Sequence, residues 1–164
     1  MMGFKHHRRL DAKENCKQLE KAGIRPVYLS KEDMLKTKTV AADLGMEIDL
    51  FNAWISLKDE DRRINRDGNE VLPAGIDNIR EHLAKVDKIP LQVQLFCDAD
   101  YRTTEQMMQV YQDEGDIVAC IGNILNSENM AAFSQSNVAI GMQISPLYRC
   151  HRCNGRVNCT RKND

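Results

Sequence analysis

Short apolar runs alternate with amphipathic stretches along most of this chain. Runs too short for an ordinary helix lie near 25–29, 53–57, 91–96, 117–121 and 137–142. Apolar residues recur at helical spacing within 11–22, 34–44, 73–87 and 101–114. The alternation predicts an α/β domain with a parallel sheet flanked by helices in three layers. We expect it to span 22–148, with the strands near 25–29, 91–96, 117–121 and 137–142 adjacent in one sheet.

Glycine and small polar residues mark the expected helix ends. Ser30, followed by Asp33, resembles a capping box that opens a helix, and Gly45 closes that helix. Gly115 similarly ends the helix that begins at 101. Residues 58–70 contain a single apolar residue, so we expect an exposed loop there.

The stretch 117–142 has the pattern of a parallel βαβ unit. An apolar run at 117–121 is followed by a polar loop, a short helical segment and a second apolar run. The loop after the first strand of such a unit lies at the carboxyl edge of the sheet, where α/β proteins bind ligands. The residues expected at that edge are Gly122, Asn123, Asn126 and Ser127.

Composition and charge limit the kinds of partner and the cellular location that we expect for this chain. The chain has 23 basic and 24 acidic residues, so its net charge of −1 offers no field that would attract nucleic acid. No run approaches the ~20 apolar residues that span a bilayer. Six irregularly spaced cysteines favour reduced thiols. We therefore expect the chain alone to be soluble and cytoplasmic.

Asp98 and Asp100 follow the apolar run that ends at Phe96 and form a D-x-D pair. The pair resembles the motif of haloacid dehalogenase phosphatases, in which the first aspartate attacks phosphorus, the second is a general acid and magnesium assists. Arg102 stands where that superfamily has Thr or Val. The alternative interpretation is a helix N-cap with solvated charges, because carboxylates favour helix starts.

Three segments resemble cation-transporting P-type ATPases, which belong to the haloacid dehalogenase superfamily. Gly23, Ile24 and Arg25 match the family's A-G-I-R segment, with Leu44 and Gly45 at its later L-G. The T-G-D of that segment is replaced by Ser30, Lys31 and Glu32.

The later motifs of the family are matched at uncharged positions, whereas their charged residues are replaced in this sequence. Gly122 and Asn126 match the family's T-G-D-G-x-N-D loop, but Asn123 and Ser127 replace its aspartates. Thr104 stands at the position of the lysine that contacts the phosphoryl group. By this resemblance the domain is a pseudoenzyme with no catalytic residue and no metal ligand. Magnesium and ATP would be cofactors only if the family's site were functional.

A longer resemblance, from about Arg25 to Cys150, is to an atypical branch of that family: multi-pass ATPase-like proteins linked to magnesium transport into the endoplasmic reticulum. It rests on segments such as Trp54–Leu57 (WISL), Leu72–Ile76 (LPAGI) and Pro146–Tyr148 (PLY). It implies a cytosolic domain at the endoplasmic reticulum membrane, whose partners are the remainder of a multi-pass protein and other proteins. The family's phosphorylated D-K-T-G-T motif is absent from this sequence.

The ends of the chain are expected to lie outside the domain. Residues 1–21 form a basic lead and a short helix. Residues 149–164 are basic, and Cys150 and Cys153 have the C-x-x-C spacing of a zinc-ligand pair, with Cys159 and His151 as the other ligands on offer. Structural zinc needs four ligands with a second pair suitably spaced. We predict a disordered tail without zinc.

Overall fold

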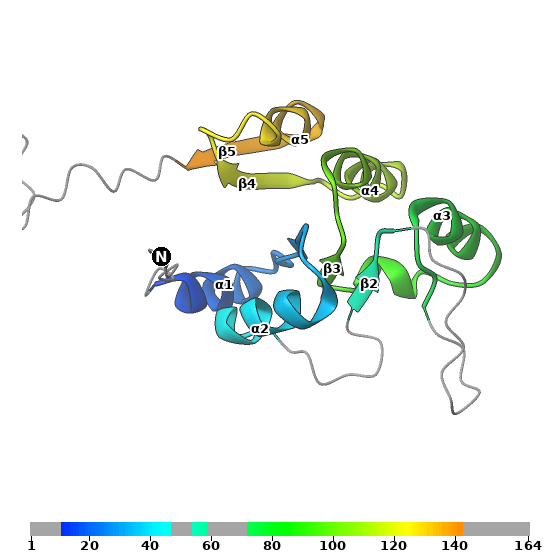
Figure 1. Ribbon diagram of the computed structural model, residues 1–164, viewed down its shortest axis with the longest axis horizontal. Coiled ribbons are helices and arrows are strands. Elements are labelled where there is room, and N and C mark those ends of the chain that lie inside the picture. The colour runs from blue at the N-terminus through cyan, green and yellow to red at the C-terminus, as the bar shows by residue number, and fades with distance from the viewer. Residues whose placement is uncertain (1–10, 47–53, 59–71, 143–164) are drawn as a thin grey trace, which may run out of the picture. The chain divides into compact units, whose positions relative to one another are not determined.

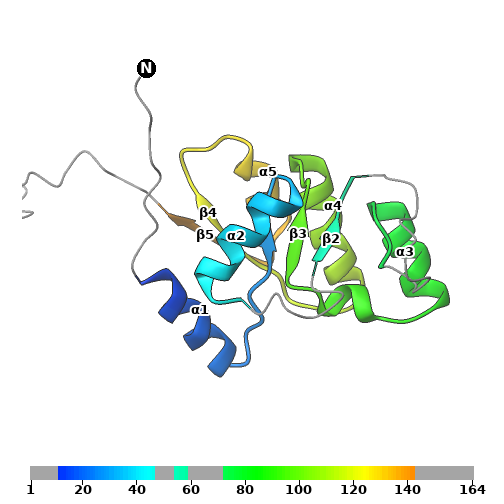
Figure 2. The same ribbon diagram turned by 60° about the horizontal axis from the view of Figure 1, so that its bottom comes forward.

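The computed structural model describes residues 11–46, 54–58 and 72–142. By their contacts, residues of the chain fall into two compact units, Met1–Ile117 and Val118–Asp164. Each unit is described by itself below (Figures 1 and 2).

The first unit is built on a three-stranded parallel sheet. Its strands are β1 (Tyr28–Leu29), β2 (Trp54–Ser56) and β3 (Leu95–Cys97), in the order β1-β3-β2. Tyr28 and Trp54 both pair with Leu95. The central strand therefore uses both of its edges within this unit.

Helices lie on both sides of that sheet. They are α1 (Ala12–Lys21), α2 (Met34–Leu44), α3 (Ile76–Lys85) and α4 (Tyr101–Asp113), with a 3₁₀ turn at Ile89–Gln92. Figures 1 and 2 both show α2 and α4 on opposite sides of β3.

The buried residues explain this layering. Leu95 packs with Ala41 of α2, and Tyr28 and Trp54, in the same row of the sheet, pack against them. The next residue along β3, Phe96, is fully buried and points to the other face, because side chains alternate along a strand. On α4 the buried residues are Met107, Met108, Val110 and Tyr111.

The second unit is a βαβ unit. It consists of β4 (Ala119–Asn123), α5 (Asn129–Gln135) and β5 (Val138–Met142), with the two strands parallel and Ile121 opposite Ile140. Within the described part of this unit, Ala132 is the single buried hydrophobic residue. The described part of the second unit therefore has little core of its own.

The predicted class is confirmed: parallel strands flanked by helices form an α/β structure. The prediction of one sheet was wrong, because β3 is already paired on both sides and β4 pairs with β5 instead. Part of the expected strand at 91–96 is a 3₁₀ turn. The domain bounds 22–148 stay a prediction, and the tail at 149–164 and most of the loop at 58–70 lie outside the described residues.

The start of α2 also differs from expectation. Asp33, rather than Ser30, is the N-cap, and its carboxylate accepts a hydrogen bond from the Lys36 N–H at 3.0 Å. The Ser30 hydroxyl accepts instead from the Glu32 N–H at 3.1 Å. Gly45 ends the helix as predicted, with φ 77°, a left-handed conformation that glycine adopts freely.

Candidate functional site

The carboxyl ends of β1, β2 and β3 bring three loops together in the first unit. The Asp98 N–H donates to the Glu32 carbonyl at 3.1 Å, and the Ala99 N–H donates to the Ser30 carbonyl at 2.9 Å. The structure thus joins two of the loops that the sequence singled out. Their main chains continue the β1–β3 contact beyond the ends of the strands.

Asp98 is held in an unusual backbone conformation at the end of β3. Its φ is 54°, and it is the one non-glycine residue with positive φ among the described residues. Aspartate tolerates this region better than most side chains do. Its carboxylate oxygen Oδ2 accepts hydrogen bonds from Ser56 Oγ at 2.8 Å and from Cys97 Sγ at 3.3 Å. The side chain therefore links β3 to the end of β2.

The Cys97 thiol acts as a donor in this cluster. Burial, together with the hydrogen bond to Asp98, raises the pKa of Cys97 to about 12. A thiol with such a pKa stays protonated at neutral pH, whereas a nucleophilic cysteine needs its thiolate. Cys97 is consequently suited to orienting Asp98 and not to covalent catalysis.

Asp100 is the N-cap of α4. Its carboxylate accepts from the Thr103 N–H at 2.7 Å, and the Thr103 hydroxyl accepts from the Asp100 N–H at 2.9 Å, which completes a capping box. The Thr103 backbone hydrogen bond lowers the pKa of Asp100. Thr104 lies in the first turn of α4, where its N–H donates to the Asp100 carbonyl. The helix-cap interpretation is confirmed for Asp100, whereas Asp98 is not a cap.

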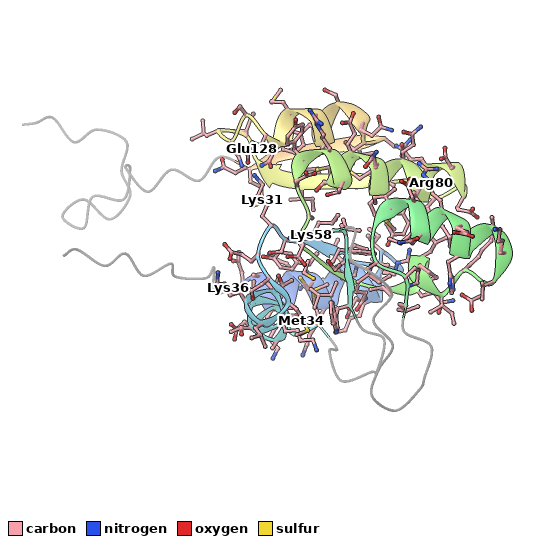
Figure 3. All side chains as sticks on the ribbon, turned by 45° about the vertical axis from the view of Figure 1, so that its right-hand side comes forward. Lys31, Met34, Lys36, Lys58, Arg80 and Glu128 are labelled. Carbon is pink, nitrogen blue, oxygen red and sulfur yellow. The ribbon has the colours of Figure 1, made fainter. Side chains whose placement is uncertain are left out.

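The loop after β1 is stabilised in a similar way. Asp33 caps α2, and the hydrogen bond from the Lys36 backbone lowers the pKa of Asp33. Lys36 Nζ also contacts Glu32 Oε2 at 2.7 Å, and this hydrogen bond raises the pKa of Lys36. Figure 3 shows Lys31 and Lys58 on the loops that follow β1 and β2, and both are exposed.

These caps determine what the two helix starts can bind. A helix N-terminus attracts phosphate because its first N–H groups lack partners within the helix. At α2 and α4, carboxylates of the chain itself, Asp33 and Asp100, accept from those N–H groups. An incoming phosphate would therefore compete with a carboxylate at either helix start.

In the second unit, the other four predicted residues lie at the end of β4 (Gly122 and Asn123) and in the loop that follows it (Asn126 and Ser127). Asn123 Oδ1 accepts from the Leu125 N–H at 3.0 Å, and Asn126 Oδ1 accepts from the Glu128 N–H at 3.2 Å. Such contacts are typical of asparagine in turns. Ser127 is exposed, and its carbonyl accepts from the Met130 N–H. The amide oxygens of this loop stabilise the turn.

Gly122 allows α5 to approach β4 closely. A Cβ at this position would lie 3.1 Å from Asn129 Nδ2 and 3.3 Å from the ring of Phe133. The Asn129 amide donates to the Asn123 carbonyl at 2.9 Å. Gly122 therefore has a packing role in this unit.

Neither strand end assembles a cluster of metal-ligating side chains. Within the described ranges, no three His, Cys, Asp or Glu side chains gather in a way that could hold a metal ion. The described cysteines, Cys16, Cys97 and Cys120, are free thiols. Cys150, Cys153 and Cys159 lie outside the described residues, so the zinc prediction stays a prediction.

The sequence did not reveal Ser56. It lies in an otherwise apolar run, and it is only 6% exposed even though its side chain is polar. Its hydroxyl donates to Asp98, 42 residues away. A polar residue at the end of a buried strand was the available signal, since buried hydroxyls require partners.

Comparison with known proteins shows one relationship. No protein-family model matches the chain. The chain is 28% identical over 207 aligned residues to transmembrane protein 94 of Homo sapiens, and equally to that of Mus musculus. The match includes 92% of this chain and 15% of each relative, so the chain spans a small part of their length. The chain is homologous to these proteins.

The names of these relatives describe membrane proteins. Among the helices of the described ranges, none is both long enough and apolar enough to cross a bilayer.

Proposed function

We propose that this chain is the cytosolic, catalytically silent phosphorylation-type domain of an ATPase-like multi-pass membrane protein linked to magnesium transport into the endoplasmic reticulum. By "catalytically silent" we mean lacking phosphoryl-transfer activity. Two findings support the proposal: homology to transmembrane protein 94, and the altered residues at the positions that resemble P-type ATPase motifs. The remainder of the membrane protein is the expected partner.

The observation that carries the proposal concerns the polar groups that follow the carboxyl ends of β1, β2 and β3. We call this edge, with Asp33, Asp98 and Asp100, the rim. Asp100 caps α4, Asp33 caps α2, and Asp98 accepts from Ser56 and Cys97. Each of these carboxylates stabilises the loop or helix beside it. A rim of this kind suits a role in holding the domain's shape.

Electrostatics favours the same conclusion. Phosphoryl transfer depends on positioned cations that neutralise the phosphoryl oxygens. Thr104 supplies no charge at the expected lysine position. Lys36 is paired with Glu32, while Lys31 and Lys58 are exposed, where water and salt screen their charge. Asp98 and Asp100 would therefore repel a phosphate dianion.

A silent domain of this kind would act through contacts. It would couple movements of other parts of the membrane protein, or would bind a protein partner. Neither role requires ATP or magnesium at the rim.

The second candidate is a magnesium-dependent phosphatase using Asp98 and Asp100. The observation that favours it is the left-handed conformation of Asp98, because strained residues cluster at active sites. The donors Ser56 and Cys97 would orient its carboxylate, leaving Oδ1 for attack on phosphorus.

Phosphate release separates the two candidates. The full chain is incubated with acetyl phosphate or p-nitrophenyl phosphate, with and without magnesium, beside Asp98→Asn and the surface control Asp113→Asn. Asparagine tolerates a left-handed backbone and can accept from Ser56, so Asp98→Asn should fold. We expect all three proteins to match the buffer blank. Magnesium-dependent turnover that Asp98→Asn abolishes and Asp113→Asn retains would establish the phosphatase.

A further inference from the structure

The sheet of the second unit carries three β-branched apolar side chains that are about half exposed. Ile121 is 53% exposed, Val138 48% and Ile140 46%. Scattered apolar residues are normal on protein surfaces, but a contiguous group marks an interaction site. These three side chains form such a group, because Ile121 pairs with Ile140 in the sheet and Val138 lies two residues before Ile140.

The two faces of the β4–β5 sheet differ in side-chain size. Gly122 faces α5, since a Cβ there would touch Asn129 and Phe133. Alternation along the strands places small residues on this same face, namely Cys120, Gly122, Ala139 and Gly141. Figure 1 shows α5 alongside the two strands. We call the opposite face, with Ala119, Ile121 and Asn123 of β4 and Val138, Ile140 and Met142 of β5, the outer face.

The outer face has the composition of a buried surface. None of the sheet residues on it is charged, and the bulky β-branched residues of the sheet lie there. Parallel sheets are covered on both faces in nearly all known cases. Two strands alone are also marginally stable in water. Within its own unit, the described part of the chain places α5 and the side chain of Ile124 against the other face.

We propose that the outer face docks the apolar side of a helix contributed by the rest of a longer membrane protein. The inference rests on the proposed function, in which this chain is one domain of such a protein. A helix is the occupant that covers a parallel sheet in α/β structures. The match to 15% of each relative indicates how much additional polypeptide such a protein would provide. Because the outer face has no charge, the docking side of the helix must be apolar.

Covalent footprinting tests this proposal. Two proteins are compared: the full chain alone, and a longer protein in which this chain replaces the matched segment of the human relative. Both are labelled with a photoactivated carbene and analysed by mass spectrometry. In the isolated chain, Ile121, Val138 and Ile140 are about half exposed and should label clearly, though less than Leu125, which is 70% exposed. In the longer protein their labelling should fall to that of Phe96, which is fully buried.

A matched pair of variants separates docking from general instability. In the longer protein, Ile140→Lys should restore labelling of Ile121 and Val138, whereas Leu125→Lys in the neighbouring loop should leave them protected. Sedimentation of the isolated chain establishes whether it is monomeric.

Three results would overturn the inference and leave the silent rim untouched: strong labelling that persists in the longer protein, protection already present in the monomeric chain, or a dimer that Ile140→Lys dissociates. The unmodified human protein should be recovered in the membrane fraction. If the longer protein that carries this chain is absent from that fraction, the proposed membrane role fails, and the inference fails with it. Phosphate release by the isolated chain tests the silent rim separately.

Discussion

The ends of β3 and β4 use their polar side chains in two different ways. At β3 the carboxylates of Asp98 and Asp100 remain, but they accept hydrogen bonds from neighbouring groups of the protein. At β4 the corresponding polar groups are the neutral amides Asn123 and Asn126, which accept from the backbone of their own turn. The comparison teaches that charged and neutral side chains at a strand end can both be used to support the local fold.

The largest expected contrast is in the stability contributed by side chains of β3 and β4, because they differ in burial. Phe96 is fully buried, so Phe96→Ala should lower the free energy of unfolding by about 3–5 kcal/mol. Ile121→Ala removes a half-exposed side chain and should cost roughly 1 kcal/mol or less. Urea denaturation of the isolated chain measures both. Equal losses would mean that the two strands are equally well covered.

Next comes the hydroxyl that anchors Asp98. Ser56→Ala removes the 2.8 Å hydrogen bond to a half-buried carboxylate and should destabilise the chain by about 1–3 kcal/mol. The control is Ser127→Ala in the exposed loop after β4, which should change stability by less than about 0.5 kcal/mol. If Ser56→Ala proved as mild as the control, the Asp98 carboxylate would not depend on this donor.

The cap of α4 should show a smaller effect that depends on pH. Asp100→Ala should cost about 1 kcal/mol at neutral pH, because the Thr103 N–H loses its acceptor. The pKa of Asp100 is lowered in the folded state from 3.8. Its contribution is therefore present above the unfolded pKa and is lost as pH falls through the lower folded value.

Denaturation midpoints at pH 7 and in steps below pH 4 provide the test of this cap. The difference between the parent chain and Asp100→Asn should be smaller in acid. A difference independent of pH would show that the ionised carboxylate is not the stabilising group. Asn123→Ala at the end of β4 provides the comparison, since an amide does not titrate.

The smallest expected effect is a gain of metal affinity at β4. Asn123→Asp with Ser127→Asp introduces the two aspartates that the P-type ATPase loop has and this chain lacks. Magnesium is held through carboxylates. Isothermal titration should detect weak magnesium binding by the double variant, with Asn126→Asp alone as the control. Lack of binding would mean that the geometry of this loop, as well as its charge, has diverged.

Much of the local structure could be predicted from the sequence. Apolar spacing located the helices that became α2 and α4, and Gly45 and Gly115 marked their ends. The cap at Asp100 was also predictable, because carboxylates favour helix starts. These features depend on residues within one or two turns of each other.

Long-range pairing could not be predicted in the same way. Whether β4 joins β3 depends on whether β2 has already taken that edge, and a short run such as Trp54–Ser56 does not reveal its neighbour. The bond from Ser56 to Asp98 depends on the same pairing, since it joins the ends of β2 and β3. Apolar periodicity indicates which face of a strand is buried and carries no information about register between distant strands.

The central claim is that these strand ends bind neither magnesium nor phosphate. Its most direct test is an NMR titration that observes the ends of β3 and β4 in the same spectrum. Amide spectra of the full chain are recorded with increasing magnesium chloride and acetyl phosphate, and compared with sodium chloride of equal ionic strength. The account predicts that the amides of Ser30, Asp98 and Asn123 shift no more with magnesium and phosphate than with the salt control. Saturable shifts at these residues, absent in the salt control, would contradict it.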